Sequence, residues 1–425
     1  MLASAARWLR THAFTPSATG AAERIGVEAE WIPVRADGRP APIITPDGRG
    51  TVNALRRVAA QRGWSESTST KSGVSEFISP DRDRVTFEPG GQIEFAAAPA
   101  ASPGAVTSSV RSFGSTLADA CGEFGYRLCT MGLDPFTPIE AAPLQLHAER
   151  YRRMDEHFAR IGPDGARMMR QTASLQITLE TGEQPEERWK LLQALTPYLA
   201  GIFANAPLQN GIGTGWSSMR RSIWDAVDPS RTGLVIGEPD DDVATAYARF
   251  ALGADAFLIG AAGEPARPLA HWGERAAPGT AAWAEHLTTL FPEVRARGYF
   301  EVRTCDAIPE EFCAAPLVFL TGLVCSVPAA HEAAALLRVG EVPPDPAMLS
   351  RAGRCGMRDA DLRATAGELW ALALEGAARL GTTIADEVAL ATAHDFVARY
   401  TARGLTPADD AIAALSAQEP SGLAQ

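Results

Sequence analysis

The segment Ile25-Gly26-Val27-Glu28-Ala29-Glu30-Trp31 constrains the fold most strongly, because apolar and acidic residues alternate along it with a period of two. Successive side chains of an extended strand point to opposite faces, so the apolar residues share one face while Glu28 and Glu30 share the other. Two carboxylates held side by side repel each other unless positive charge lies near them. We therefore predict a half-buried strand whose polar face surrounds a cation.

A second acidic segment, residues 87–95 (FEPGGQIEF), repeats this alternation around a Pro-Gly-Gly interruption. Proline and paired glycines end regular strand pairing. A bulge or tight turn at this point would direct Glu88 toward the same place as Glu94. We expect both carboxylates to face the one formed by the first strand.

Two further segments offer a polar face, since residues 174–179 (SLQITL) carry Gln176 and residues 301–303 place Glu301 beside Arg303. Alternation alone is also typical of an ordinary antiparallel sheet with one solvated face. Such a face usually mixes Lys with Glu, whereas these four segments contain no Lys. Carboxylate and amide oxygens are the ligands that Mg²⁺ prefers, which favours a cation site.

Short alternating segments lie between longer helical ones, which is typical of an α+β fold. We expect strands at residues 25–34, 85–88, 92–96, 126–132, 174–180 and 299–304, and helices that include residues 105–123 and 186–204. From about residue 329 the strand signals vanish, while leucines recur at helical spacing in Ala-rich surroundings. These patterns predict a mixed domain over residues 1–328 and a helical C-terminal subdomain, residues 329–425, packed on it.

Charge and composition exclude several classes of protein. The net charge is -12 with a sequence pI near 5.2, and no block of Lys and Arg is present to neutralise a nucleic acid. No stretch is long and apolar enough to span a membrane, and residues 1–14 lack the apolar core of a secretion signal. The six cysteines form no Cys-x-x-Cys pair, so free thiols are expected. We predict a cytoplasmic protein that binds neither nucleic acid nor membrane.

Some features are better explained by structure than by chemistry. The turn Gly211-Ile212-Gly213-Thr214-Gly215 is not followed by Gly-Lys-Ser/Thr, which favours a tight turn over a phosphate loop. His147, His157 and His286 show no metal-binding spacing. Cys305 has no paired histidine or second cysteine nearby, so we expect no nucleophilic or redox role for it.

Several segments in one order resemble the glutamate-cysteine ligases, in the branch that holds the plant and many bacterial enzymes, including the ergothioneine-pathway ligases of actinobacteria. The similarity runs from Arg24 to about Val327 and weakens in the helical tail. The segments that carry it are residues 26–30 (GVEAE), 88–94 (EPGGQIE), 168–176 (MMRQTASLQ), 203–207 (FANAP), 219–224 (MRRSIW), 231–233 (RTG), 286–292 (HLTTLFP) and 301–303 (EVR).

This resemblance implies a glutamine synthetase-like fold, a curved antiparallel sheet forming an open bowl flanked by helices. It implies that Arg303 contacts the transferred phosphoryl group, that Arg220 binds the α-carboxylate of glutamate and that Trp224 lines the substrate pocket. Without the family, Arg220 would equally suit a solvated turn. The residues implied as metal ligands are Glu28, Glu30, Glu88, Glu94, Gln176 and Glu301.

The activity implied by the resemblance is ATP- and Mg²⁺-dependent formation of γ-glutamylcysteine from glutamate and cysteine, through a γ-glutamyl phosphate. Such a product belongs to glutathione or ergothioneine biosynthesis. Two alternatives stay open: a related ligase that uses a different amine or acid, and a catalytically silent homologue. The silent homologue is disfavoured because the acids and Arg303 are all present. We expect small-molecule substrates only, and either a monomer or a homodimer.

Overall fold

The computed structural model of the chain describes residues 1–20, 23–261, 264–381 and 386–418. Within these residues, nine strands form one antiparallel sheet in the order β12-β13-β7-β1-β5-β4-β3-β2, and β6 pairs with the C-terminal part of β1. The strands of this sheet are β1 (Ile25–Arg35), β2 (Ser65–Thr68), β3 (Ser75–Ile78), β4 (Arg84–Phe87), β5 (Ile93–Ala100), β6 (Tyr126–Cys129), β7 (Leu175–Leu179), β12 (Val294–Ala296) and β13 (Phe300–Val302).

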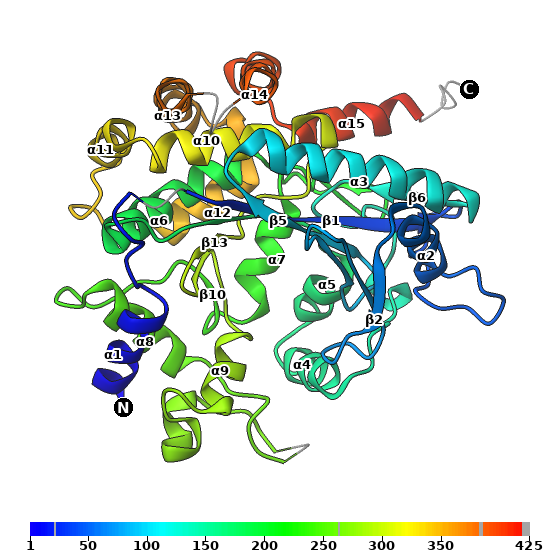
Figure 1. Cartoon of the computed structure of the whole chain (residues 1–425), viewed down its shortest axis with the longest axis horizontal. Helices are drawn as coiled ribbons and strands as arrows, with labels where there is room; N and C mark the ends of the chain where they lie inside the picture. The colour runs from blue at the N-terminus through cyan, green and yellow to red at the C-terminus, as the bar shows by residue number, and fades with distance from the viewer. Residues whose placement is uncertain (21–22, 262–263, 382–385, 419–425) are drawn as a thin grey trace, which may run out of the picture.

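Helices flank both faces of the sheet (Figure 1). The helices α3 (Pro103–Glu123), α6 (Pro185–Ile202) and α10 (Ala314–Val324) lie above it in that view, and an outer layer covers α10. The helices of this outer layer are α11 (Val327–Leu336), α13 (Ala360–Leu380) and α14 (Glu387–Arg399), whereas α12 (Pro346–Cys355) packs against α6 and α7. The last helix of the described chain is α15 (Pro407–Gln418).

On the lower side, shorter helices and hairpins stand around the sheet (Figure 1). The helices in this lower half, with those near the N-terminus, are α1 (Leu2–His12), α2 (Thr51–Arg62), α4 (Glu149–Ala159), α5 (Asp164–Gln171), α7 (Met219–Val227), α8 (Val243–Gly253) and α9 (Ala281–Leu287). The remaining short strands are β8 (Leu208–Gln209), β9 (Ile212–Gly213), β10 (Thr232–Gly233) and β11 (Phe291–Pro292).

Strand β1 lies at the centre of the sheet and pairs with β5 on one side and β7 on the other. Its odd-numbered residues Val27, Ala29 and Trp31 are buried under the upper helices, while Glu28 and Glu30 are only half-buried. The alternation expected from the sequence is therefore confirmed, as are the six predicted strands to within a few residues at their ends.

Helix α3 covers the apolar face of the sheet. It begins at a strong cap, because the Ser102 hydroxyl accepts from the Ala105 N–H at 3.1 Å and Pro103 occupies the first helical position. Its buried side presents Val110 and Phe113 to strands β1 and β5. The helix thus seals one face of the sheet and leaves the acidic face for chemistry.

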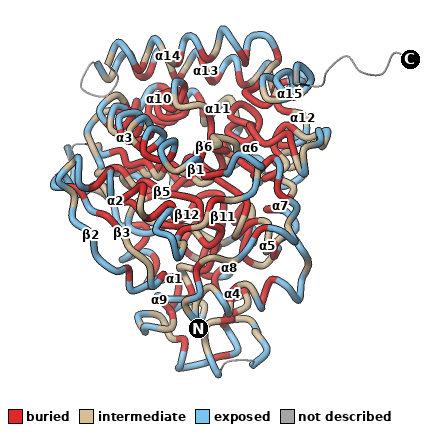
Figure 2. Tube along the Cα trace, turned by 90° about the vertical axis from the view of Figure 1, so that its right-hand side faces the viewer, coloured by how far each residue is buried: buried red, intermediate tan, exposed pale blue. Residues whose placement is uncertain are grey.

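From Val327 onward the described residues form helices, apart from one isolated bridge between Val339 and Val342. The tail shares the main hydrophobic core, because Trp370 of α13 and Phe396 of α14 lie 6.1 and 5.1 Å from Phe203 between ring centroids. Figure 2 shows this buried layer continuing from the sheet into the upper helices. A division into residues 1–328 and 329–425 stays a prediction.

Two minor expectations have direct outcomes. The glycine-rich segment forms the tight turn of the β8-β9 hairpin, in which Asn210 and Gly211 have φ of 54° and 76°, as a two-residue hairpin turn of type I′ requires.

In the described part of the chain, no single helix is long and apolar enough to cross a membrane. The segments Glu310–Val324 and Val327–Leu336 reach that length and hydropathy only when taken together, and a bend of 91° separates them.

Candidate active site

Strand pairing brings the predicted acids onto one face of the sheet. Glu30 of β1 lies directly opposite Glu94 of β5, and Glu28 lies opposite Gln176 of β7. Residues opposite each other in an antiparallel pair share a face, with Cβ atoms about 4.5 to 5.5 Å apart. On β13, Glu301 pairs with Thr178, two residues along β7 from Gln176. The lower face of the sheet is therefore a polar floor built from four adjacent strands.

The Pro-Gly-Gly interruption is a tight turn that adds Glu88 to this floor. The N–H of Gly91 donates to the Glu88 carbonyl at 2.8 Å, and the N–H of Glu88 donates to the Gln92 carbonyl at 2.9 Å. Gly91 has φ of 94°, a conformation that favours glycine. A Cβ there would also lie 2.4 Å from the amide nitrogen of Gln145. The turn expected from the sequence is thus present.

Burial and mutual repulsion make these carboxylates reluctant to ionise. Burial, with the charges of Glu94 and Glu301, raises the pKa of Glu28 to about 8. Burial, with the charge of Glu30, raises the pKa of Glu94 to about 7, and burial together with Glu94 raises the pKa of Glu88. A cation placed among them would favour their charged forms.

Glu301 differs from the other acids because arginines surround it. Burial opposes its ionisation, but the charges of Arg295 and Arg303 outweigh that and lower the pKa of Glu301 to about 2. Arg295 Nη2 donates to Glu301 Oε1 and Oε2 at 2.6 and 2.9 Å. Arg303 Nη1 donates both to Glu301 and to the Gln176 amide oxygen. Glu301 therefore holds Arg303 in a defined position on the polar floor.

Glu30 is also held by neighbouring groups. Its Oε2 accepts from the Ser174 N–H at 2.7 Å, and its Oε1 accepts from Gln176 Nε2 at 3.1 Å. Burial raises the pKa of Glu30, while the charge of Arg220 and the bond from Ser174 act in the opposite direction. Its carboxylate orientation is consequently set before any ligand arrives.

Arg220 lies at the start of α7, where Ser218 caps the helix. Its Nη1 and Nη2 donate to the carbonyls of Thr304 and Arg303 at 3.2 and 2.9 Å, and Nη1 is 3.6 Å from Asp306 Oδ1. The guanidinium lies 4.6 Å from the Trp224 ring centroid, in a cation–π contact. Arg220 is buried, and among the described groups its Nε has no partner. The solvated turn considered from sequence alone is therefore wrong.

The donor set suits a hard cation, although no closed metal cluster is already assembled. Within the described residues, no three His, Cys, Asp or Glu side chains converge as a metal site would require. In the same part of the chain, the carboxylates of Glu28 and Glu88 accept no hydrogen bond, and Glu94 accepts one, from Thr86 at 2.9 Å. These three carboxylates have oxygens free to bind Mg²⁺.

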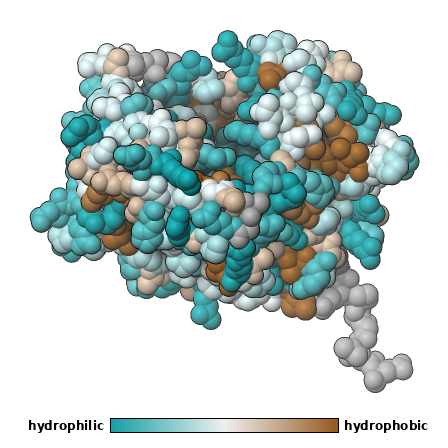
Figure 3. All heavy atoms as spheres, turned by 90° about the horizontal axis from the view of Figure 1, so that it is seen from below, coloured by the Kyte–Doolittle hydropathy of each residue, from teal (hydrophilic) through white to brown (hydrophobic). Residues whose placement is uncertain are grey.

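Basic residues beside the acids were not predicted from the sequence. Lys71, in the loop between β2 and β3, has its pKa lowered by loss of solvent and by the charges of Arg297, Arg84 and Arg150. Arg297 Nη1 also lies 3.6 Å from Glu301 Oε2. Seen from below, this side of the molecule is largely hydrophilic (Figure 3). The alternation of Val294-Arg295-Ala296-Arg297 is a signal that could have identified two of these arginines.

Comparison with known families decides what kind of site this is. A family model described as "Glutamate-cysteine ligase family 2" matches residues 24–422. The chain belongs to this family. Its membership confirms the resemblance found in the sequence, and it makes the chain an ATP-dependent ligase that joins a carboxylate to an amine. The family match extends through the helical tail, which the sequence motifs did not reach.

Individual relatives agree with this family. Glutamate-cysteine ligase EgtA of Mycolicibacterium smegmatis is 32% identical over 368 residues, covering 81% of this chain and 84% of that protein. The chloroplastic glutamate-cysteine ligase A of Oryza sativa subsp. japonica is 28% identical over 316 residues, or 71% of this chain and 63% of that protein. Both similarities span most of this ligase.

The fold is shared with a solved ligase structure. The glutamate-cysteine ligase of Francisella tularensis, in complex with AMP, superposes with a TM-score of 0.55 at 13% identity, over 93% of this chain and 85% of that one. At this identity the likeness concerns the fold alone. It supports the predicted α+β class, an open antiparallel sheet flanked by helices, which is confirmed.

Proposed function

We propose that this ligase forms γ-glutamylcysteine from glutamate and cysteine with conversion of ATP to ADP and phosphate. The observation that carries the proposal is the polar floor, where acids of β1 and β5 lie beside an arginine fixed by Glu301 and Gln176. Positive and negative groups close together are what a polyphosphate, a cation and an amino acid require together. Family membership supports the same reaction.

The reaction divides into two balanced steps. An oxygen of the glutamate γ-carboxylate attacks the γ-phosphorus of ATP, the bond to the β-phosphate oxygen breaks, and ADP leaves. The amine nitrogen of cysteine then attacks the activated carbonyl carbon, loses a proton, and expels phosphate. A free carboxylate is a poor electrophile, so the first step makes the second feasible at neutral pH.

Positioning and electrostatics are the contributions of the protein to phosphoryl transfer. We assign Arg303 to the migrating phosphoryl group, because Glu301 and Gln176 hold its guanidinium in place before the substrate arrives. A donor that needs no reorganisation stabilises developing charge most effectively. Lys71 and Arg297, at the edge of the floor, would attract the negatively charged nucleotide.

Mg²⁺ is the cation we propose, held by Glu28, Glu88 and Glu94 with Glu30, Gln176 and Glu301 as further candidates. When bound, it would neutralise phosphate charge and orient the transferred group. The two oxygens of Glu301 already accept four hydrogen bonds from Arg295 and Arg303, and the amide oxygen of Gln176 accepts one from Arg303, so both residues have less capacity left for a cation. The first three carboxylates therefore suit the metal better.

We propose that Arg220 helps to bind the glutamate α-carboxylate through its unpartnered Nε, and that the ring of Trp224 packs against its guanidinium and lines the substrate pocket. Arg220→Lys retains the charge but loses the planar donors, so we expect the glutamate KM to rise about tenfold or more, with a smaller change in the ATP KM. Equal shifts in both constants would show that Arg220 acts only through the backbone carbonyls that it binds.

The amine and the acid are tested by ADP release from ATP with glutamate and a panel of amines. We expect the highest kcat/KM with cysteine. Preference for another amine, or for another acid, would identify the related-ligase alternative. Absence of amino-acid-dependent turnover with every pair would favour the silent homologue. The cytoplasmic location and the choice between monomer and homodimer stay predictions.

The intermediate is tested with hydroxylamine in place of cysteine. A γ-glutamyl phosphate should be trapped as γ-glutamyl hydroxamate, and omission of ATP should abolish this product. Release of AMP and pyrophosphate instead of ADP and phosphate would mean that the carboxylate is adenylated. That result would overturn the mechanism while leaving the ligase class intact.

A further inference from the structure

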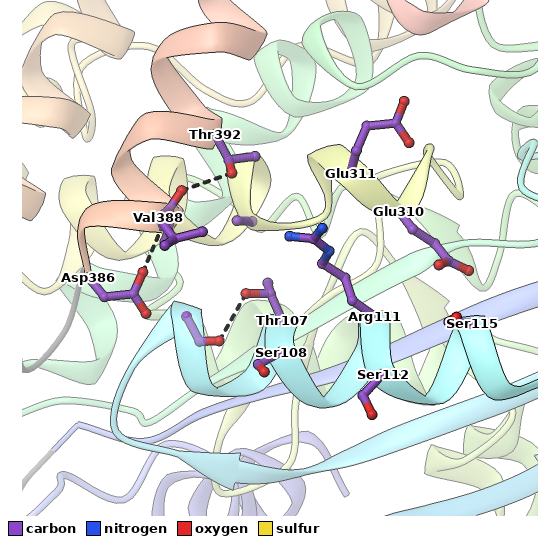
Figure 4. Close-up of a pocket in the computed structure, with 13 residues that line it drawn as sticks. Thr107, Ser108, Arg111, Ser112, Ser115, Glu310, Glu311, Asp386, Val388 and Thr392 are labelled. Carbon is purple, nitrogen blue, oxygen red and sulfur yellow. Dashed lines mark hydrogen bonds between the residues drawn. The ribbon is translucent and has the colours of Figure 1, made fainter.

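A second cavity lies on the far side of the sheet from the acids. It has a volume of about 680 Å³ and is bounded by α3, by the turn that precedes α10, and by the first turns of α14 (Figure 4). None of its lining residues belongs to the polar floor. Its size lies within the range of small-molecule sites, about 300 to 1,000 Å³. The proposed ligase reaction leaves this cavity without a role.

The lining is polar and carries both signs of charge. Arg111 projects from α3 toward the middle of the cavity, with Glu310 and Glu311 on one side of it and Asp386 on the other (Figure 4). Hydroxyl groups of α3, including that of Ser108, line its floor. A guanidinium is the best side chain for binding a carboxylate, and glutamates bind an ammonium group. The two kinds of group side by side match a zwitterion.

One of these acids connects the cavity to the catalytic strand. Glu310 Oε1 accepts from the indole N–H of Trp31 at 2.9 Å, and Trp31 directly follows Glu30 in β1. Glu310 is also confined by α3, because a Cβ added to Gly114 would lie 2.3 Å from its Oε1. A small void of about 20 Å³ is lined by Glu30, Ser174 and Glu310 together. Glu310 therefore joins the cavity to the strand that carries Glu30 through a direct contact.

We propose that this cavity is an effector site for a small zwitterion, an amino acid or a short peptide, whose carboxylate binds Arg111 and whose ammonium binds Glu310 and Glu311. Occupation draws Glu310 toward the ligand and changes its bond to Trp31. That bond biases the position of β1, so the effector alters catalysis from the opposite face of the sheet. The proposal thus names two distinct sites, the cavity and the polar floor, and the strand β1 that joins them.

Binding is tested without relying on ligase activity. The full-length protein is screened by thermal unfolding against the twenty amino acids and a set of dipeptides, and hits are titrated calorimetrically. We expect at least one probe whose Kd weakens about tenfold or more in Arg111→Gln. The matched control is Arg7→Gln, which removes an exposed arginine from α1 and should leave the Kd unchanged. Absence of any hit, or equal affinity in Arg111→Gln, overturns the effector site.

The connection to catalysis is tested with the same probe. In the wild-type enzyme it should change kcat/KM for ATP turnover, and in Trp31→Phe it should bind but no longer change the rate, because phenylalanine cannot donate to Glu310. A rate effect that persists in Trp31→Phe overturns this route. A probe that binds without any rate effect overturns regulation by the cavity. If the ligase reaction itself proves to be misassigned, the binding result is unaffected.

Discussion

The two faces of the sheet use the same strands for opposite purposes. On the lower face, Glu28 and Glu94 stand close enough that each raises the pKa of a neighbouring acid. On the upper face, the next residue along β5 is Phe95, which stacks on Phe113 with ring centroids 4.4 Å apart and on Trp64 at 6.2 Å. The lower face therefore holds carboxylates that repel one another, whereas the upper face holds aromatic rings in apolar contact.

This difference shows where the stability of the polar floor originates. Burying like charges is unfavourable, so the floor persists because the aromatic layer beneath α3 fixes the strands that carry the acids. Separation of roles between faces also predicts that substitutions on each face change different observables. The lower face should control turnover, and the upper face should control the free energy of unfolding.

The largest effect is expected from Arg303→Ala, which removes a guanidinium held by both Glu301 and Gln176. We expect kcat to fall by about 10³-fold, because a preorganised donor of this kind contributes about that much, with little change in the unfolding midpoint. Steady-state kinetics and urea unfolding measure the two quantities. A loss confined to ATP affinity would contradict a role in the transition state.

On the upper face, Phe95→Ala should lower the free energy of unfolding by about 3 to 5 kcal/mol, because a fully buried ring is replaced by a cavity. Phe95→Leu should cost considerably less, since most of the volume is kept. Urea titration of both variants checks this order. If Phe95→Ala lost stability no more than the leucine variant, the aromatic layer would not be what fixes the strands.

The group expected to lower the free energy of unfolding in acid is His286 of α9, which belongs to neither the polar floor nor the aromatic layer. Burial, together with the charge of Arg231, lowers the pKa of His286 to about 4, and its Nε2–H donates to the Ala251 carbonyl at 2.8 Å. At His286 the unfolded state therefore binds more protons than the native state between pH 6.5 and 4, so the contribution of this residue to stability falls with pH across this window, by up to about 3 kcal/mol.

His286→Gln removes this titration while retaining a side-chain donor. We expect the unfolding free energy of His286→Gln, measured relative to that of the wild-type protein, to rise as pH falls from 6.5 to 4. Protonation of the raised-pKa acids acts in the opposite direction, since it relieves their repulsion. An unchanged pH dependence in His286→Gln would show that His286 does not control stability in this window.

The smallest change in stability is expected from Glu28→Gln, in a buffer without divalent cations near pH 8. Loss of one repelling charge should raise the unfolding free energy by about 1 kcal/mol, while activity with Mg²⁺ falls about 100-fold. Glu30→Gln should lose similar activity without gaining stability, because Glu30 already accepts from Ser174 and Gln176. Turnover near normal in both variants would refute the metal assignment.

Local alternation predicted much of the fold and of the polar floor. It placed Glu28 and Glu30 on one face of β1 and identified the turn at Gly91, because both depend on neighbours in sequence. It did not predict that Arg295 binds Glu301, even though the two are only six positions apart. That pairing depends on the register of β12 against β13.

The environment of Arg220 depended even more on tertiary structure. Its backbone partners Arg303 and Thr304 lie more than eighty positions away, and its charged neighbour Asp306 was not among the expected site residues. Lys71 was missed for a similar reason, because a hairpin loop brings it to the acids. Long-range partners of charged side chains are set by topology, which period-two patterns do not encode.

The strand order has a consequence for how this protein is made. Strand β1 is translated first among the strands of the sheet, yet its neighbour β7 begins at Leu175, and β7 in turn pairs with β13, which begins at Phe300. About 300 residues must therefore leave the ribosome before the catalytic sheet can close. The edge of β1 that pairs with β7 waits for about 140 further residues, which at common rates of about 5 to 20 residues per second takes about 7 to 28 seconds. Its two glutamates, charged while solvated, are then well placed to discourage that edge from pairing with another nascent chain.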